Sequence, residues 1–203
     1  TVTKLVLDKT VSAKSKQQIA TLFSNAIQSA RDEGKSMNDR EAATRLLAFA
    51  VTSTATSALS EFLSPQTAPQ LQRAAVASLA RHDSNEIATT LLEGWKTYGP
   101  QVRQDVVDAL VQKTSRIHSL LQAVETNVVK RSDLTRDRKQ LLMNHPNSTV
   151  STRSRKLFGV DLNSDRAKVV SNYQDVLTLD GDIARGQAVF KKICSTCHRV
   201  GNI

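Results

Sequence analysis

Hydrophobic residues recur at helical spacing from about residue 14 to about residue 193, and Pro and Gly fall at the breaks between the runs. Apolar positions three and four residues apart predict amphipathic helices that each bury one face. Gly34 is expected to end the first helix, over residues 14–34. Asn38 and Asp39 are N-cap residue types and are expected to open the next one. The pattern therefore predicts an all-α protein.

An internal repeat occupies the middle of the chain. The segment PQLQRAAVASLA begins at Pro69, and the similar segment PQVRQDVVDALV begins at Pro100, 31 residues later. The matched apolar positions are Leu71/Val102, Ala75/Val106, Val76/Val107 and Leu79/Leu110. A second apolar helix follows each copy, and residues 37–63 resemble a third, poorer copy. Two helices per repeat at this period are typical of α-solenoids.

The repeats resemble HEAT-like repeats, although they are somewhat short for that class. We expect helix pairs around residues 38–64, 68–97 and 100–125 to stack side by side within a repeat domain that covers residues 1–180. Trp95 and Tyr98 flank a helix end, and we expect them to close the core between repeats.

Three further helices are predicted after residue 130, over 134–144, 148–158 and 164–179. Ser148 and Asn163 are suitable N-cap residues for the last two. The candidate buried residues of this part are Leu141, Leu142, Leu157, Phe158, Val169, Val170, Tyr173, Val176 and Leu177. Asp180-Gly181-Asp182 then breaks the pattern, and Asp182 can cap a final helix. A domain boundary is expected between residues 180 and 181.

Composition agrees with a helical globular protein. Hydrophobic residues make up 39% of the chain and charged residues 23%, whereas seven Gly and four Pro are too few for the many tight turns of a β-sandwich or barrel. No apolar run approaches the roughly 20 residues that a membrane-spanning helix needs.

The charge is unevenly distributed. The 28 Lys and Arg residues exceed the 19 Asp and Glu residues by nine. Segment 130–168 contains the basic residues Lys130, Arg131, Arg136, Arg138, Lys139, Arg153, Arg155, Lys156, Arg166 and Lys168, with four acidic ones. Such a segment is most often a solvated helical face, and the alternatives are binding to an acidic protein surface, a phosphate-rich surface or nucleic acid. The lack of interleaved aromatic residues disfavours nucleic acid.

Both cysteines lie in one motif, Cys194-Ser195-Thr196-Cys197-His198. C-x-x-C-H is the attachment pattern of c-type haem. Two intervening residues let the two thiols reach the two vinyl groups at one porphyrin edge, and His198 is then the expected proximal iron ligand.

A dithiol redox motif and a structural zinc site are the alternatives. Zinc requires four ligands, but the chain has no further Cys, and His82, His118 and His145 are scattered along it. A thioredoxin-like motif requires a surrounding βαβ pattern, which the helical flanks disfavour.

The residues before the motif carry a family resemblance. The segment GDIARGQAVFKKI, residues 181–193, resembles the N-terminal helix of class I cytochromes c, in which Gly186, Phe190 and Cys194 share one helix face. The order of features along the chain resembles the C-terminal part of planctomycete-type haem-binding proteins. These features are helical repeats, a helix with Tyr173 and then the motif G-D-x-x-R-G-x-x-V-F-x-x-x-C-x-x-C-H. The resemblance covers about residues 65–203 and is most specific over 180–199.

This resemblance implies electron transfer. Covalent haem c would be held by Cys194, Cys197 and His198 and would accept electrons from a redox partner protein or a fused dehydrogenase module. Such proteins are exported, which implies the periplasm or the cell envelope. An interaction scaffold whose basic face binds an acidic partner or nucleic acid is the alternative function, and no enzyme active-site motif is found in these residues.

The motif lies close to the last residue, Ile203, and the chain does not start with Met. We therefore expect both ends to be cuts through a longer protein, with residues 181–203 forming a truncated cytochrome domain. The sixth haem ligand of class I cytochromes, usually Met, would lie beyond this chain, because Met37 and Met143 are interpreted as core or surface residues. Haem is thus expected in the intact exported protein and not in this fragment.

Overall fold

The computed structural model describes residues 10–195 and 198–201, with the backbone alone at 160–167 and 177. The chain is all-α over these residues, which include no strand. It divides into two compact units, Thr1–Gly159 and Val160–Ile203, and each is described by itself. The expected domain boundary between residues 180 and 181 stays a prediction.

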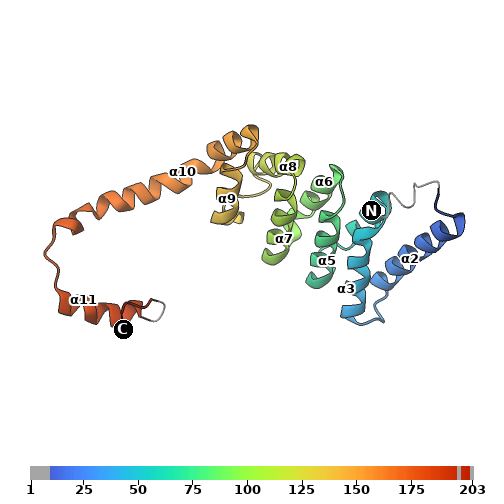
Figure 1. Cartoon of the computed structure of the whole chain (residues 1–203), viewed down its shortest axis with the longest axis horizontal. Coiled ribbons are helices and arrows are strands. Elements are labelled where there is room, and N and C mark those ends of the chain that lie inside the picture. The colour runs from blue at the N-terminus through green and yellow to red at the C-terminus, as the bar shows by residue number, and fades with distance from the viewer. Residues whose placement is uncertain (1–9, 196–197, 202–203) are drawn as a thin grey trace. The chain divides into compact units, whose positions relative to one another are not determined.

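Successive helices of the first unit pack against one another (Figure 1). The helices are α2 (Ala13–Arg31), α3 (Met37–Leu46), α4 (Thr52–Glu61), α5 (Pro69–Ala80), α6 (Glu86–Glu93), α7 (Pro100–Val111), α8 (Thr114–Glu125), α9 (Arg136–Met143) and the first part of α10 (Ser148–Asn172). Short 3-10 turns η1 (Leu47–Phe49), η2 (Trp95–Thr97) and η3 (Arg131–Asp133) connect some of them. Helix α5 lies between α3 and α7, while α4 contacts α5, and α8 contacts both α6 and α7.

The repeated apolar positions form the core of this unit. All eight matched residues, Leu71, Ala75, Val76, Leu79, Val102, Val106, Val107 and Leu110, are at most 2% exposed. Pro69 and Pro100 each occupy the first turn of their helix, where a missing backbone N–H costs nothing. Trp95 and Tyr98 are also buried, as predicted. The helices expected for the two main copies are thus confirmed, together with their buried faces.

One side-chain hydrogen bond recurs in three successive helix pairs. It runs from Arg40 Nε to the Ala30 carbonyl (3.1 Å), from Gln72 Nε2 to the Ser64 carbonyl (2.8 Å) and from Arg103 Nε to the Trp95 carbonyl (3.1 Å). The donors are 32 and 31 residues apart, which are the offsets of the repeated apolar positions. Carbonyl groups near helix ends lack an intrahelical partner, so each donor satisfies a carbonyl of the preceding segment. The repeat therefore includes a recurring hydrogen bond as well as recurring apolar positions.

Two buried polar side chains join neighbouring helix pairs. The guanidinium of Arg116, on α8, donates from Nη1 to the Ala80 carbonyl at 2.9 Å and from Nη2 to the His82 carbonyl. Only 1% of Arg116 is exposed. His82 is 5% exposed, and its Nε2 lies 3.0 Å from the Leu47 carbonyl. A carbonyl can only accept, so Nε2 of His82 carries the proton. Each side chain thus serves a carbonyl at the end of a helix in the adjacent pair.

We expect His82 to make stability depend on pH. Burial lowers the pKa of His82, and the neighbouring Arg116 and Arg81 lower it further, while the hydrogen bond to Leu47 opposes them. Below the unfolded-state pKa of about 6.5, the unfolded chain binds a proton that the folded chain does not. The free energy of unfolding should therefore fall as the pH drops from about 7 towards 5.

His82→Gln keeps a donor for the Leu47 carbonyl and removes the titration. Urea unfolding at several pH values should show a shallower fall for this variant than for the native chain, by up to about 1.4 kcal/mol per pH unit. Identical pH profiles for the two proteins would contradict the assignment.

Two predicted helix ends are wrong because side-chain hydrogen bonds form at other residues. Helix α2 ends at Arg31 rather than Gly34, and the Asp32 carboxylate accepts the Gly34 N–H at 2.9 Å, which closes a turn. Helix α3 is capped by Ser36, whose Oγ accepts the Asp39 N–H at 3.2 Å, so Asn38 and Asp39 lie inside it. Serine two residues earlier satisfies the free N–H groups of the first turn equally well.

The predicted break between residues 158 and 164 is also wrong. Helix α10 continues from Ser148 to Asn172, and Asn163 lies within it rather than at its start. The residue that caps α10 is Asn147, whose Oδ1 accepts the Val150 N–H at 3.1 Å, and not Ser148. A residue with N-cap propensity does not interrupt a helix that is already hydrogen-bonded on both sides.

Burial after residue 130 follows the prediction only in the first unit. Leu142, Leu157 and Phe158 are buried there, whereas Leu141 is 41% exposed. In the second unit, Val169, Val170, Tyr173 and Val176 are all more than half exposed, and Leu177 falls outside the described side chains. The predicted burial of these four residues and of Leu141 is wrong, because a periodic apolar stripe is buried only where another element covers it, and the prediction for Leu177 is untested. The 3-10 turn η4 (Gln174–Thr178) follows α10.

Candidate functional site

The C-x-x-C-H motif follows the last helix of the chain. Helix α11 (Ile183–Val189) is capped by Asp182, whose carboxylate accepts the Arg185 N–H at 2.9 Å, as predicted. A π-helical turn, η5 (Phe190–Cys194), continues α11 up to the first cysteine. Single π turns within helices occur frequently at functional sites.

Backbone hydrogen bonds bring the first and last motif residues into one turn. The His198 N–H donates to the Cys194 carbonyl at 2.9 Å, and the Ser195 N–H donates to the Phe190 carbonyl at 3.0 Å. Ser195 Oγ also donates to the Lys191 carbonyl at 2.7 Å. Cys194 is a free, partly exposed cysteine, and His198 is exposed. Thr196 and Cys197 lie outside the described residues, so the position predicted for Cys197 is untested.

The helix face before the motif is open. A Cβ added at Gly186 would meet no heavy atom within 4 Å. Phe190 is only partly buried, and Ile193, one residue before Cys194, is 68% exposed. The Gly186–Phe190–Cys194 face, which the cytochrome resemblance singles out, is therefore not covered by any described residue near Gly186.

The described residues fit a covalently attached haem. A thiol and an imidazole one turn apart, both accessible, are the donor types that such a group needs at its edge and at its iron. Among the described residues, no three His, Cys, Asp or Glu side chains lie close enough to hold a metal ion.

The remaining histidines and methionines lie in the first unit and serve local structure. His82 is the buried donor to Leu47, and His145 Nδ1 accepts the Asn147 N–H at 3.1 Å. His118 is half-buried, with Nδ1 3.4 Å from the Arg153 guanidinium. Met143 is buried and Met37 half-buried, which agrees with their interpretation as core or surface residues.

The basic segment 130–168 is only partly free. Arg138 pairs with Asp108 at 2.6 Å, and Arg153 pairs with Glu125 at 2.8 Å. The exposed basic residues of the segment within the first unit are Lys130, Arg131, Arg136, Arg155 and Lys156. No described helix is long and apolar enough to cross a membrane.

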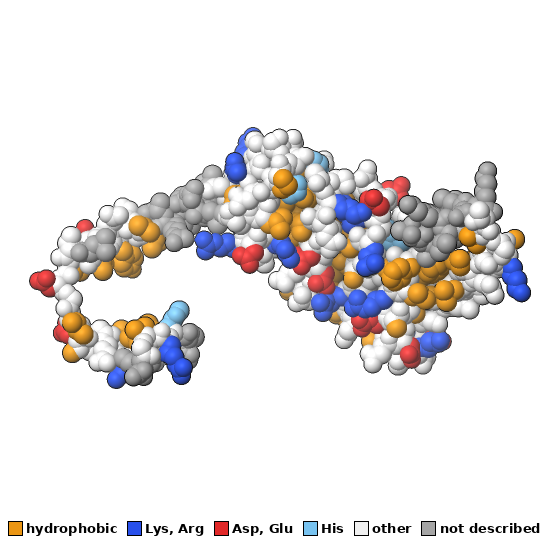
Figure 2. All heavy atoms as spheres, in the orientation of Figure 1, with side chains coloured by type: hydrophobic (Ala, Val, Ile, Leu, Met, Phe, Trp, Pro, Cys, Tyr) orange, Lys and Arg blue, Asp and Glu red, His pale blue; other side chains and the backbone are white. Residues whose placement is uncertain are grey.

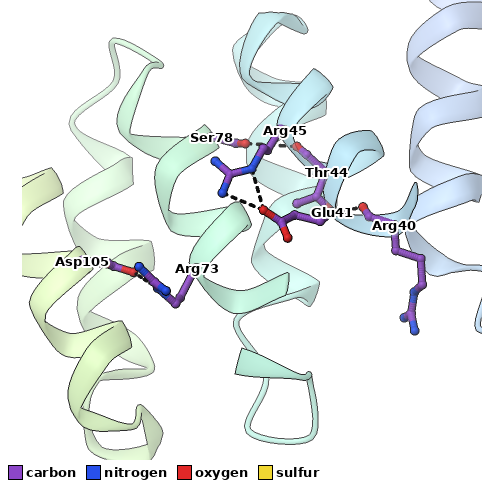
Figure 3. A network of polar contacts seen from close by, with 7 residues as sticks. All are labelled: Arg40, Glu41, Thr44, Arg45, Arg73, Ser78 and Asp105. Carbon is purple, nitrogen blue, oxygen red and sulfur yellow. Dashed lines mark hydrogen bonds and ion pairs between the residues drawn. The ribbon is translucent and has the colours of Figure 1, made fainter. Parts of the chain in front are cut away.

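Ion pairs on the surface of the first unit were not predicted from the sequence. Arg73, on α5, contacts Asp105, on α7, at 2.6 Å, while Arg45 contacts Glu41 within α3 at 2.8 Å (Figure 3). The signal was present as opposite charges separated by about one repeat, 32 residues for Arg73 and Asp105. Such a spacing becomes informative only once the repeat positions that face solvent are known.

Comparison with known proteins gives no relative: no family model, no curated protein and no solved structure matches this chain.

Proposed function

We propose that this chain is part of an electron-transfer protein, in which a HEAT-like α-solenoid is joined to the start of a c-type cytochrome domain. The observation that carries the proposal is the C-x-x-C-H motif at the end of a capped helix, with Cys194 and His198 accessible in one turn. The open face at Gly186 and Phe190 supports it further.

Three residues would hold the haem. The Cys194 and Cys197 thiols would each add across one vinyl group, so that a C–S bond forms and the thiol hydrogen ends on the other vinyl carbon. No oxidant or reductant is consumed in this addition. His198 would ligate the iron through its imidazole, and the bound haem would supply a one-electron redox couple.

The repeat domain would act as the scaffold of this protein. Helix pairs at a period near 31 residues, with the same apolar positions and the same interhelical hydrogen bond from Arg40, Gln72 and Arg103, support a solenoid. In this proposal the electron donor is a dehydrogenase-like module or a separate redox protein, and the protein is exported to the periplasm or cell envelope.

Haem attachment is tested on the complete protein, exported from cells that produce cytochrome maturation machinery. Mass spectrometry should show one haem bound to the peptide that contains Cys194 and Cys197. The double variant Cys194→Ala with Cys197→Ala should show none, whereas Ser195→Ala, a substitution between the two cysteines, should keep the adduct. A haem adduct that persists in the double variant would refute the assignment.

The alternative proposal is a scaffold that binds an acidic partner through the exposed basic residues Arg131, Arg136, Arg155 and Lys156. Binding to a polyanion such as heparin should then weaken steeply with salt, because each neutralised anionic group releases a counterion. Strong, salt-dependent heparin binding without any haem adduct would favour this function over electron transfer.

A further inference from the structure

A groove of about 690 Å³ runs over α3, α5 and α7 in the first unit. Its floor consists of small or buried apolar residues, namely Ala48, Val76, Ala77, Ala80 and Ala109. Alanine side chains end at Cβ, so they leave a hollow between the longer side chains of the rim. Figure 2 shows basic and acidic side chains beside one another across these helices.

Most charges around the groove are neutralised in pairs. The pairs are Glu41 with Arg45 (2.8 Å), Arg73 with Asp105 (2.6 Å, Figure 3) and Asp108 with Arg138 (2.6 Å). Paired charges largely cancel at a distance, so the groove offers little attraction to a polyanion. The three carboxylates that line it would repel a phosphate backbone.

Arg81 is the exception on this surface. The other two arginines of the groove, Arg45 and Arg73, form ion pairs, whereas none is found for Arg81 within the described ranges. Its Cζ lies 5.0 Å from the centre of the Phe49 ring, which is itself 51% exposed. Stacking on the ring holds the guanidinium in place while its N–H groups remain able to bind a carboxylate. The groove therefore offers an exposed aromatic ring and an unpaired cation side by side.

We propose that this groove binds a linear peptide segment of a partner protein that carries a single acidic residue. One carboxylate of the segment pairs with Arg81, and a neighbouring aliphatic or aromatic side chain packs against Phe49 and the alanine floor. Three adjacent helices at spacings of about 8–10 Å span about 16–20 Å, which matches five or six extended residues at about 3.3 Å each. A single free cation among neutral pairs suits one carboxylate better than a nucleic acid strand.

This surface is independent of the proposed haem site, since every residue that forms it lies in the first unit. It can therefore be tested on the chain without haem, and its failure would leave the proposal of electron transfer untouched.

The probe is a displayed library of random 12-residue peptides, selected against the whole chain. Enriched peptides should share an Asp or Glu beside an aliphatic or aromatic residue. A synthetic enriched peptide should bind at least tenfold more weakly to Arg81→Gln and to Phe49→Ala, and equally to Lys96→Gln, which removes an exposed charge outside the groove. Replacing its acidic residue by the corresponding amide should cause a similar loss.

Circular dichroism shows whether the variants stay folded. We expect them to do so, because Arg81 and Phe49 are exposed. The proposal is overturned if no peptide is enriched, or if the enriched peptides are basic. It is equally overturned if both groove variants bind the enriched peptide as well as the native chain does. Tighter binding of single-stranded DNA than of any peptide would also contradict it.

Discussion

Leu79→Asp should unfold the first unit. Leu79 is fully buried between neighbouring helices, so the substitution places a carboxylate where neither water nor a cation can reach it. The lost apolar burial costs about 1.5–3 kcal/mol, and burial of an unpaired polar group adds several kcal/mol more. Because domains are stable by only about 5–15 kcal/mol, urea unfolding followed by circular dichroism should show a largely unfolded or strongly destabilised protein.

Leu141→Asp is the matched control for this substitution. The sequence pattern predicts burial of both leucines, but Leu141 is 41% exposed. Its carboxylate would remain hydrated, so the midpoint of urea unfolding should change little. Equal losses of stability in the two variants would mean that the helix faces are assigned wrongly. The same comparison can be repeated with Leu110, which is fully buried at the repeat position equivalent to Leu79.

Arg116→Met should destabilise the first unit by about 2–4 kcal/mol. The substitution leaves the Ala80 and His82 carbonyls without their donors, at about 1–3 kcal/mol for each buried group. Part of this loss is offset, because burial of the guanidinium is itself costly: Nε of Arg116 has no hydrogen-bond partner, and burial lowers the pKa of Arg116. The unpaired carbonyls outweigh that relief, since methionine cannot donate.

Two further variants separate charge from geometry at this position. Arg116→Lys keeps the charge but replaces a planar fork by a single ammonium group, so its loss should be smaller than that of Arg116→Met. Arg45→Met breaks only the exposed pair with Glu41 and should cost less than about 0.5 kcal/mol. The prediction fails if urea unfolding shows that Arg116→Met and Arg45→Met lower the free energy of unfolding by the same amount.

The candidate site divides between what was predictable and what was not. C-x-x-C-H and the cap at Asp182 are local features, so the residues themselves identify them, and the structure confirms the cap. The π-helical turn before Cys194 and the openness of the Gly186 face depend on which hydrogen bonds and neighbours form, and no residue pattern encodes them. The groove at Arg81 and Phe49 was missed for a related reason, because its residues come from separate helices and meet only after packing.

Apolar spacing was sufficient to predict the helices of the first unit and their buried faces, since a helix has a fixed period and the repeat shows the same face twice. Helix ends such as Asp32 and Ser36 were less predictable, because several neighbouring side chains can cap the same N–H or carbonyl groups with similar free energy.

Burial in the second unit shows where local information stops. Val169, Val170, Tyr173 and Val176 have the same spacing as the buried residues of the repeats, yet they are exposed. An apolar stripe records only that a helix can pack on one side. Whether the helix packs depends on a second surface at the right distance. The ion pairs between helices, the buried Arg116 and the groove depend on neighbouring helices in the same way. Only the tertiary structure decides these contacts, because the contributing residues lie about one repeat or more apart in the chain.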